Sequence, residues 1–176
     1  FVTNLSSSRA IEDVARRYGA DVHRSAVGEI NVVKKMQEVG AVLGGEGNGG
    51  VILPDLHYGR DALVGTAMIL HHLAATEQTL SDVRQSLSAY AIAKHKLQLD
   101  GRDAQALLAA LAKRYQSARV STVDGVKIDF DEGWVHLRTS NTEPILRVYA
   151  EAATPEQADA MAQRFQKELN EVDKEG

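Results

Sequence analysis

The most concentrated chemistry in this chain lies at residues 138–144, which read RTSNTEP. This stretch places the guanidinium group of Arg138 close to the polar side chains of Ser140, Asn141 and Thr142. Arginine offers a planar fork of donors that suits oxyanions, and the N–H groups of a tight loop can form a concave nest for an anion. The alternative is a polar hairpin turn that contains an arginine by chance. Seven residues in this order favour a loop that binds phosphate.

A second unusual segment occupies residues 44–50 and reads GGEGNGG. Glycine carries an ordering cost of about 0.5–1 kcal/mol relative to alanine, so this concentration indicates that the backbone approaches another group closely. The segment lacks the spacing of a dinucleotide fingerprint and the Lys-Ser/Thr of a Walker loop. It does present Glu46 and Asn48, and a carboxylate can accept hydrogen bonds from two adjacent sugar hydroxyls. The alternative is a flexible loop with Glu46 in solvent.

Other charged residues are candidates for supporting roles. Glu29 either lines a binding cleft or serves as an acid at the start of a helix. Arg60, between an expected strand and a long helix, either faces the same cleft or lies in solvent. Glu143 would repel an anion, so we expect it to point away from the ligand and to brace Arg147 or the amides of the loop.

The pattern of apolar residues predicts strands that alternate with helices in the first half of the chain. The expected strands cover residues 1–5, 21–26, 41–43 and 51–53, and the expected helices cover residues 9–19, 29–39 and 61–75. In the second of these helices, Ile30, Val33 and Val39 are expected to face inward. Such alternation favours an α/β fold with some parallel pairing. We therefore predict a mixed βαβ domain of three-layer type over residues 1–78.

The order of the expected helices and strands changes after this domain. Residues 76–90 predict a connecting helix with Leu80, Val83 and Leu87 on one side, and residues 79–91 form the expected linker. Further expected elements are a strand at 91–99, a helix at 101–115, an antiparallel meander at 120–150 and a final helix from the capping residue Thr154 to about residue 172. We therefore predict a second domain of the α+β class over residues 92–176, in which a small antiparallel sheet packs against helices.

Composition excludes several classes of protein. A hydrophobic content of 44% and a charged content of 25% are typical of a globular protein. A net charge of −4 gives no broad basic field for nucleic acid. The absence of cysteine excludes disulfides and thiolate metal sites, and no apolar run is long enough to span a membrane. We expect neither a nucleic-acid partner nor a membrane partner, and we interpret a chain that begins at Phe1 in a strand as a fragment of a longer protein.

Taken together, the segments at 44–50 and 138–144 resemble two loops of the α-D-phosphohexomutases, the superfamily of phosphoglucomutases, phosphomannomutases and phosphoglucosamine mutases. Members of this family have four domains. The third carries a sugar loop of the type Gly-Glu-x-Ser-Gly, and the fourth carries a phosphate loop of the type Arg-x-Ser-Asn/Gly-Thr-Glu/Thr-Pro. Residues 27–29, which read VGE, also look like the segment before the second helix of the third domain. The resemblance covers essentially the whole chain, which would be the third and fourth domains.

The resemblance implies a role for each matching residue. Glu46 and Asn48 would bind sugar hydroxyls. The phosphate that is not reacting would be held by Arg138, Ser140, Asn141, Thr142 and Arg147. The family reaction moves phosphate between C1 and C6 of a hexose through a phosphoserine and a bisphosphorylated intermediate. The implied substrate is thus a hexose phosphate, and the implied location is the cytoplasm.

Two departures from the family pattern leave the choice among glucose, mannose and glucosamine phosphates open. Asn48 stands where many members have serine, and Gly50 stands where many have histidine. This form favours the phosphoglucosamine or phosphomannomutase branches. The family's phosphoserine loop and its Asp-x-Asp-x-Asp magnesium loop do not occur here, so this chain is expected to contain no catalytic residue and no metal ligand. The Mg²⁺ of the complete enzyme would be bound by a missing N-terminal domain.

We therefore predict the C-terminal half of a phosphohexomutase, inactive by itself, in which the turns that carry Glu46 and Arg138 converge on one hexose. The alternative is a stand-alone module that binds a sugar phosphate without catalysis.

Overall fold

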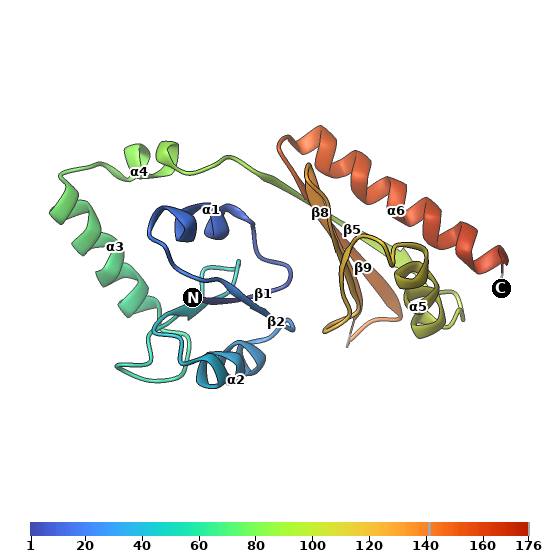
Figure 1. The fold of residues 1–176 in the computed structure, drawn as a ribbon, viewed down its shortest axis with the longest axis horizontal. Helices are drawn as coiled ribbons and strands as arrows, with labels where there is room; N and C mark the ends of the chain where they lie inside the picture. The colour runs from blue at the N-terminus through green and yellow to red at the C-terminus, as the bar shows by residue number, and fades with distance from the viewer. Residues whose placement is uncertain (141, 176) are drawn as a thin grey trace. The chain divides into compact units, whose positions relative to one another are not determined.

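The computed structural model describes residues 1–140 and 142–175, with side chains described as far as residue 172. The chain forms two compact units, Phe1–Ala89 and Tyr90–Gly176, and each unit has its own sheet (Figure 1). Among the helices within the described ranges, none combines the length and the hydrophobicity needed to cross a bilayer.

The first unit is a mixed α/β domain, as the sequence predicts. Its strands are β1 (Val2–Asn4), β2 (His23–Ser25), β3 (Gly44–Gly45) and β4 (Val51–Ile52). Its helices are α1 (Ala10–Arg17), α2 (Glu29–Val39), α3 (Ala62–Thr76) and α4 (Leu80–Ser86). The sheet has the order β2-β1-β3-β4, in which β1 runs parallel to β2 and β3 while β4 runs antiparallel to β3.

Helix α2 covers one face of this sheet. The buried side chains of Val32 and Met36 pack there against Val2 and Ile52. The expectation that Ile30 faces inward is wrong, because its side chain is 65% exposed. Residues two positions apart on a helix point about 200° apart, so burial of Val32 turns Ile30 towards solvent. The expected inward positions at 33 and 39 are partly buried at the edge of this cluster.

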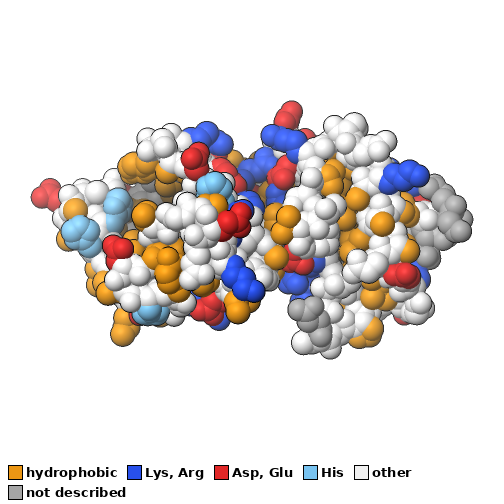
Figure 2. Space-filling view, turned by 60° about the horizontal axis from the view of Figure 1, so that its bottom comes forward, with side chains coloured by type: hydrophobic (Ala, Val, Ile, Leu, Met, Phe, Trp, Pro, Cys, Tyr) orange, Lys and Arg blue, Asp and Glu red, His pale blue; other side chains and the backbone are white. Residues whose placement is uncertain are grey.

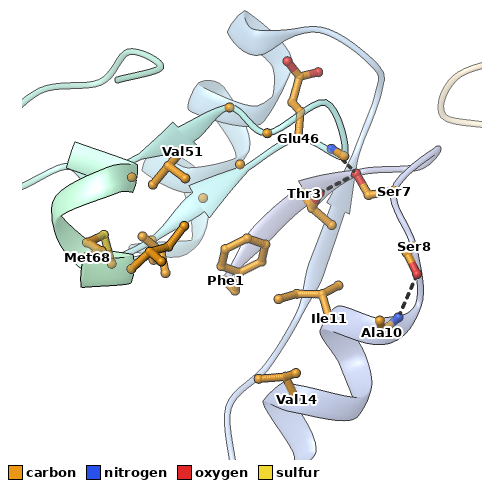
Figure 3. Close-up of a pocket in the computed structure, with 18 of the residues that line it drawn as sticks. Phe1, Thr3, Ser7, Ser8, Ala10, Ile11, Val14, Glu46, Val51 and Met68 are labelled. Carbon is orange, nitrogen blue, oxygen red and sulfur yellow. Dashed lines mark hydrogen bonds between the residues drawn. The ribbon is translucent and has the colours of Figure 1, made fainter. Parts of the chain in front are cut away.

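The other face of the sheet borders a hollow of about 590 Å³ that is lined by residues of α1, α3 and α4. Figure 3 shows the side formed by Ile11 and Val14 of α1 and the side formed by Met68 of α3. The apolar side chains that line it include Phe1, Ile11, Val14, Met68, Leu80, Val83 and Leu87. The last three share one side, as predicted. On α3, the side chain of Ile69 is 52% exposed and that of Leu70 is 61% exposed. Figure 2 shows that hydrophobic side chains lie among the polar ones on the surface of the molecule.

Two element boundaries differ from those expected. The third strand begins at Gly44 and does not cover residues 41–43, because the ladder with β1 begins where the Val2 N–H donates to the Leu43 carbonyl. The expected helix at 76–90 is shorter. Glu77 ends α3 in a left-handed conformation (φ 54°), and Thr79 then starts α4 with a capping box.

The second unit combines one antiparallel sheet with two helices, as predicted. Its strands are β5 (Ala91–Gln98), β6 (Arg119–Ser121), β7 (Val126–Asp129), β8 (Gly133–Thr139) and β9 (Ile145–Ala152). Its helices are α5 (Ala104–Arg114) and α6 (Pro155–Glu175), and α6 extends past the expected end near residue 172. The sheet has the order β5-β9-β8-β7-β6 with every pair antiparallel.

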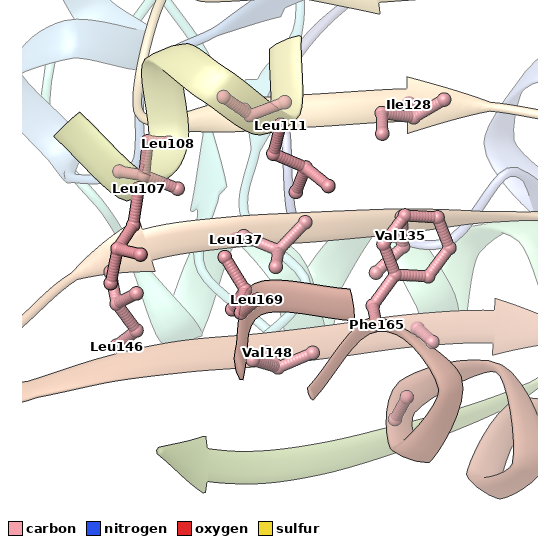
Figure 4. Packing of buried hydrophobic residues seen from close by; sticks show 13 residues of the cluster. Leu107, Leu108, Leu111, Ile128, Val135, Leu137, Leu146, Val148, Phe165 and Leu169 are labelled. Atoms are coloured by element: carbon pink, nitrogen blue, oxygen red, sulfur yellow. The ribbon is translucent and has the colours of Figure 1, made fainter. Parts of the chain in front are cut away.

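Helices α5 and α6 cover one face of this second sheet. Leu111 of α5 and Phe165 of α6 pack there against Leu137 of β8 and Val148 of β9 (Figure 4). Because side chains alternate between the two faces of a strand, the neighbouring residues of β8 and β9 point to the face away from the helices. The polar face that results is where the predicted phosphate ligands lie.

Candidate functional site

The predicted phosphate loop is the connection between β8 and β9. The Ser140 N–H donates to the Ile145 carbonyl at 3.0 Å, and the Ile145 N–H donates to the Glu143 carbonyl at 2.8 Å. These two bonds close a tight turn directly after the paired strands. At the base of the turn, Arg138 stands opposite Arg147 in the β8–β9 register.

Side chains from both ends of this turn meet. The Nη2 atom of Arg147 donates to Ser140 Oγ at 3.2 Å and to Glu143 Oε2 at 3.3 Å. The hydroxyl oxygens of Ser140 and Thr142 lie 3.4 Å apart. The turn therefore gathers Ser140, Thr142 and Arg147, and the expected contact between Glu143 and Arg147 is confirmed. Asn141 lies outside the described residues.

Arg138 is held against the backbone of a neighbouring turn. A Cβ atom at Gly125 would lie 2.1 Å from the Leu137 carbonyl oxygen and 2.8 Å from the Arg138 Cα, so only glycine fits there. The Arg138 Nε atom is buried and has no hydrogen-bond partner among the residues that the structure describes. Buried donors are normally satisfied, so this nitrogen lacks the acceptor that a buried N–H group usually has.

A third cation, Lys96, lies beside these arginines. Strand β5 pairs with β9 so that Lys96 stands opposite Arg147, and its Nζ atom lies 3.4 Å from Glu143 Oε1. Sequence reasoning missed Lys96 because it lies more than forty residues from the loop, and only the pairing of β5 with β9 brings it there.

The histidine beside this cluster is neutral near pH 7. His136 is buried, and its Nε2 atom donates to the Asp124 carbonyl at 2.6 Å. Burial lowers the pKa of His136 to about 4, an effect that the bond to Asp124 opposes and that the charges of Arg138 and Lys127 reinforce. The positive charge of the site therefore comes from the arginines and the lysine.

In the first unit, Glu46 is held in place by residues that precede it in the sequence. Its Oε1 atom accepts from Asn4 Nδ2 at 2.9 Å and from the Gly28 N–H at 3.2 Å. Only 6% of its side chain is exposed, and its Oε2 atom lies 3.7 Å from Arg60 Nη1. The alternative of a flexible loop with Glu46 in solvent is therefore wrong.

A short relay of hydrogen bonds orients this carboxylate. The Gly47 N–H donates to Ser7 Oγ at 2.9 Å, Ser7 Oγ donates to Asn4 Oδ1 at 3.0 Å, and Asn4 in turn donates to Glu46. Neither Asn4 nor Ser7 stands out in the sequence, because both belong to a common strand–turn pattern. The Glu46 carboxylate points away from the apolar hollow that lies beyond Phe1 and Ile11 (Figure 3).

Glu29 and Arg60 form an ion pair next to Glu46. Glu29 Oε1 accepts from the backbone N–H of Arg60 at 2.8 Å, and Glu29 Oε2 accepts from Arg60 Nε at 2.9 Å. The pKa of Glu29 is lowered, mainly by the hydrogen bond from the Arg60 backbone N–H and next by the bond from the Arg60 guanidinium group. The structure therefore brings Glu29, Arg60 and Glu46 together.

The glycines of this segment serve different purposes. A Cβ atom at Gly44 would lie 2.3 Å from Met36 Sδ, and one at Gly45 would lie 2.5 Å from the Gly50 carbonyl oxygen. Gly44 is therefore required by the packing of α2 on the sheet, and Gly45 by the close approach of the Gly50 backbone. At Gly50 a Cβ would lie 2.4 Å from Arg60 Cδ, so the missing side chain makes room for Arg60. Asn48 is exposed, and its Oδ1 atom accepts from the Gly50 N–H at 3.2 Å.

Within the part of the chain that the structure describes, no group of three or more His, Asp and Glu side chains could hold a metal ion.

Comparison with known proteins identifies the family of this chain. The family model for "phosphoglucomutase/phosphomannomutase, alpha/beta/alpha domain III" matches residues 1–90, and the model for the "C-terminal domain" of that family matches residues 92–168. A phosphoglucomutase/phosphomannomutase of Thermococcus kodakarensis is 39% identical over 159 residues, which cover 89% of this chain and 35% of that protein. A probable phosphoglucosamine mutase of Methanopyrus kandleri is 31% identical over 164 residues, which cover 92% of this chain and 36% of that protein.

A solved structure shares the fold. The phosphoglucomutase/phosphomannomutase family protein of Burkholderia thailandensis is 25% identical with a TM-score of 0.78, over 97% of this chain and 37% of the solved one. The chain thus spans little more than a third of the length of these proteins. Because the two family models together match most of its residues, the chain belongs to the phosphoglucomutase/phosphomannomutase family, in which it corresponds to domain III and the C-terminal domain.

Proposed function

We propose that this chain is the C-terminal part of a cytoplasmic phosphohexomutase that interconverts hexose 6-phosphate and hexose 1-phosphate. Residues 1–78 would bind the sugar, residues 79–91 would connect the domains, and residues 92–176 would bind the phosphate that is not reacting. The observation that carries this proposal is the direct opposition of Arg138 and Arg147 beside the Ser140 hydroxyl. Like charges in directly opposed positions destabilise a sheet, and an oxyanion between them removes that repulsion.

The phosphate site would use three kinds of donor. Arg138 offers its buried Nε–H, and Arg147 offers a guanidinium group that already touches the loop. Ser140 and Thr142 offer hydroxyls from the turn itself, and Asn141 is carried over from the family motif. Charge-assisted hydrogen bonds of this kind are the strong ones, and they fix both the position and the orientation of a phosphate.

The sugar site would use Glu46, with Asn48 as a second ligand. The bonds from Asn4 and Gly28 hold Oε1 of Glu46 and set the direction of the carboxylate. Adjacent sugar hydroxyls would donate to the remaining lone pairs of Glu46. Arg60 and Glu29 would border the same site, where Arg60 offsets the negative charge of Glu46.

Separate sites for the sugar and for the phosphate that is not reacting suit a mutase. A phosphoserine elsewhere in the complete enzyme would transfer its phosphoryl group to the free sugar oxygen, which yields a 1,6-bisphosphate. After the intermediate has turned around, the serine would take back the other phosphoryl group. Each phosphate would occupy the loop at 138–147 in turn, so a site made of donors that recognise phosphate alone is what this reaction needs. Positioning and electrostatics supply most of the catalysis of phosphoryl transfer.

The complete enzyme would also use Mg²⁺, which neutralises developing charge on a transferred phosphoryl group. The resemblance implies that the ligands of this ion belong to the N-terminal domains. The contribution of this chain would be to bind and orient the substrate.

The alternative, a stand-alone module that binds a sugar phosphate, uses the same two clusters. The two readings differ in one observation, namely whether the coding sequence continues upstream into a phosphoserine loop and an aspartate-rich magnesium loop.

The direct test is a calorimetric titration of residues 1–176 with glucose 1-phosphate, mannose 1-phosphate and glucosamine 6-phosphate. We expect weak binding that Arg138→Ala reduces by roughly 1.5–3 kcal/mol, the usual worth of a charge-assisted hydrogen bond. We also expect no mutase turnover by the isolated chain. An unchanged titration in the Arg138→Ala protein, with the fold intact, contradicts the proposal.

A further inference from the structure

Three cations stand in one row across the second sheet. The pairing of β8 with β9 places Arg138 opposite Arg147, and the pairing of β9 with β5 places Lys96 on the other side of Arg147. Directly opposed residues have Cβ atoms about 4.5–5.5 Å apart. All three therefore point to the same face, the one away from the helices.

Such a row is unfavourable unless negative charge lies close to it, because like charges in opposed positions destabilise a sheet. Glu143 supplies part of that charge. Its carboxylate lies 3.3 Å from Arg147 Nη2 and 3.4 Å from Lys96 Nζ, so it is shared between two of the three cations.

The contacts of Glu143 are loose. Bonds between ammonium or guanidinium groups and carboxylates are commonly about 2.7–2.9 Å long, so contacts of 3.3 and 3.4 Å are weak ones. The side chain of Glu143 is 44% exposed, and that of Lys96 is 57% exposed. Exposed ion pairs of this kind contribute little to stability and are easily exchanged.

We propose that Lys96 is a third cationic ligand of the phosphate site, and that Glu143 is an internal counter-ion which a phosphate displaces from Lys96 and Arg147. A phosphate monoester carries up to about two negative charges near neutral pH, against one on a carboxylate. It is therefore the better counter-ion for a row of three cations. This inference rests on the proposed function. It adds Lys96, a ligand outside the family motif, and it gives Glu143, which lies within the motif, the role of a competitor.

The chain offers a matched control in Lys94. It lies two residues before Lys96 on the same strand and therefore on the same face of the sheet. Its Nζ atom lies 5.5 Å from the centre of the Tyr149 ring, in the neighbouring row of the sheet. A general effect of positive charge would act on both lysines, whereas direct contact with the ligand would act on Lys96 alone.

The experiment is a titration of residues 1–176 with inorganic phosphate and with glucose 6-phosphate, carried out for the parent chain, Lys96→Gln, Lys94→Gln and Glu143→Gln. Lys96→Gln is expected to weaken binding of both probes by roughly three- to tenfold. Glu143→Gln keeps the shape but removes the competing charge, so it is expected to strengthen binding by roughly two- to fivefold. Lys94→Gln is expected to change binding by less than about twofold.

Two results overturn the inference. One is equal behaviour of the Lys96 and Lys94 variants. The other is weaker or unchanged binding in Glu143→Gln, which makes Glu143 a brace for Arg147 and not a competitor. A parallel titration of Arg138→Ala separates this failure from failure of the proposed function, since loss of binding there keeps the loop as the phosphate site. The fluorescence of Trp134, the only tryptophan, confirms that each variant is folded.

Discussion

Arg138 and Arg147 face each other across β8 and β9, and only one of them has its charge offset by a described neighbour. Arg147 touches both Ser140 and Glu143, while the Nε atom of Arg138 is buried without a partner among the described residues. Under the proposed function, an oxyanion bound between the two guanidinium groups would complete this arrangement.

Replacement of Arg147 by lysine tests whether the shape of the guanidinium group matters at this site. Arg147→Lys keeps the charge but cannot touch Ser140, Glu143 and a phosphate in one plane. We expect phosphate binding to weaken by about 1–2 kcal/mol, measured by calorimetry. Lys113→Arg on α5 serves as a surface control. Equal affinity of the parent and Arg147→Lys chains is the result against this role.

Glu46→Gln is expected to separate recognition of the sugar from recognition of the phosphate. The amide oxygen can still accept from Asn4, but the negative charge that strengthens bonds from sugar hydroxyls is lost. Affinity for a hexose phosphate should fall by about 1–2 kcal/mol, while affinity for inorganic phosphate stays unchanged. Glu38→Gln, on the exposed side of α2, is the matched control. A drop in affinity for both ligands contradicts the assignment of Glu46 to the sugar.

Gly50→Ala is expected to disturb the ion pair between Arg60 and Glu29. The added Cβ would lie 2.4 Å from Arg60 Cδ, so the arginine stem must move. Because the bonds from Arg60 hold the pKa of Glu29 below its ordinary value, the pKa of Glu29 should rise in the variant. Carboxyl ¹³C NMR across a pH titration measures this change. An unshifted pKa of Glu29 would show that Arg60 does not depend on the absent side chain.

Stability of the second unit is expected to fall as the solution is acidified below pH 6.5. The folded-state pKa of His136 is about 4, below its ordinary value of 6.5, so between these values the unfolded chain binds a proton that the folded chain does not. The stabilisation is present above pH 6.5 and is lost as the pH falls to about 4. It amounts to about 3 kcal/mol. Urea unfolding followed by Trp134 fluorescence measures it, and the slope should flatten in His136→Gln. The same slope in both proteins contradicts this assignment.

The proximity of Ser140, Thr142 and Arg147 was predictable because these residues lie close together in the sequence. Arg138, Ser140 and Thr142 are separated by single residues, and a tight turn between two strands leaves them few arrangements. The contact between Glu143 and Arg147 was predictable for a similar reason. The two residues are four positions apart, and a carboxylate beside an anion site is expected to pair with a cation.

Other features depend on contacts between distant segments and were not predictable. Lys96 joins the arginines only through the register of β5 with β9, and Asn4 reaches Glu46 across 42 residues. The prediction that Ile30 lies on the buried face of α2 was wrong because the apolar residues of this helix are compatible with more than one buried face. The start of β3 at Gly44 was missed because it is set by the pairing with β1, which cannot be seen in the sequence of this segment.

The most direct test of the central claim is NMR observation of the arginine Nε–Hε groups during a titration of residues 1–176 with a hexose phosphate. If the loop binds phosphate, the Nε–Hε signal of Arg138 should move downfield in proportion to the ligand bound, because its unused donor gains an oxyanion acceptor. The corresponding signal of Arg102, which already donates to the Leu99 carbonyl, should stay in place. An Arg138 signal that does not move at saturating ligand would contradict the assignment of this loop as the phosphate site.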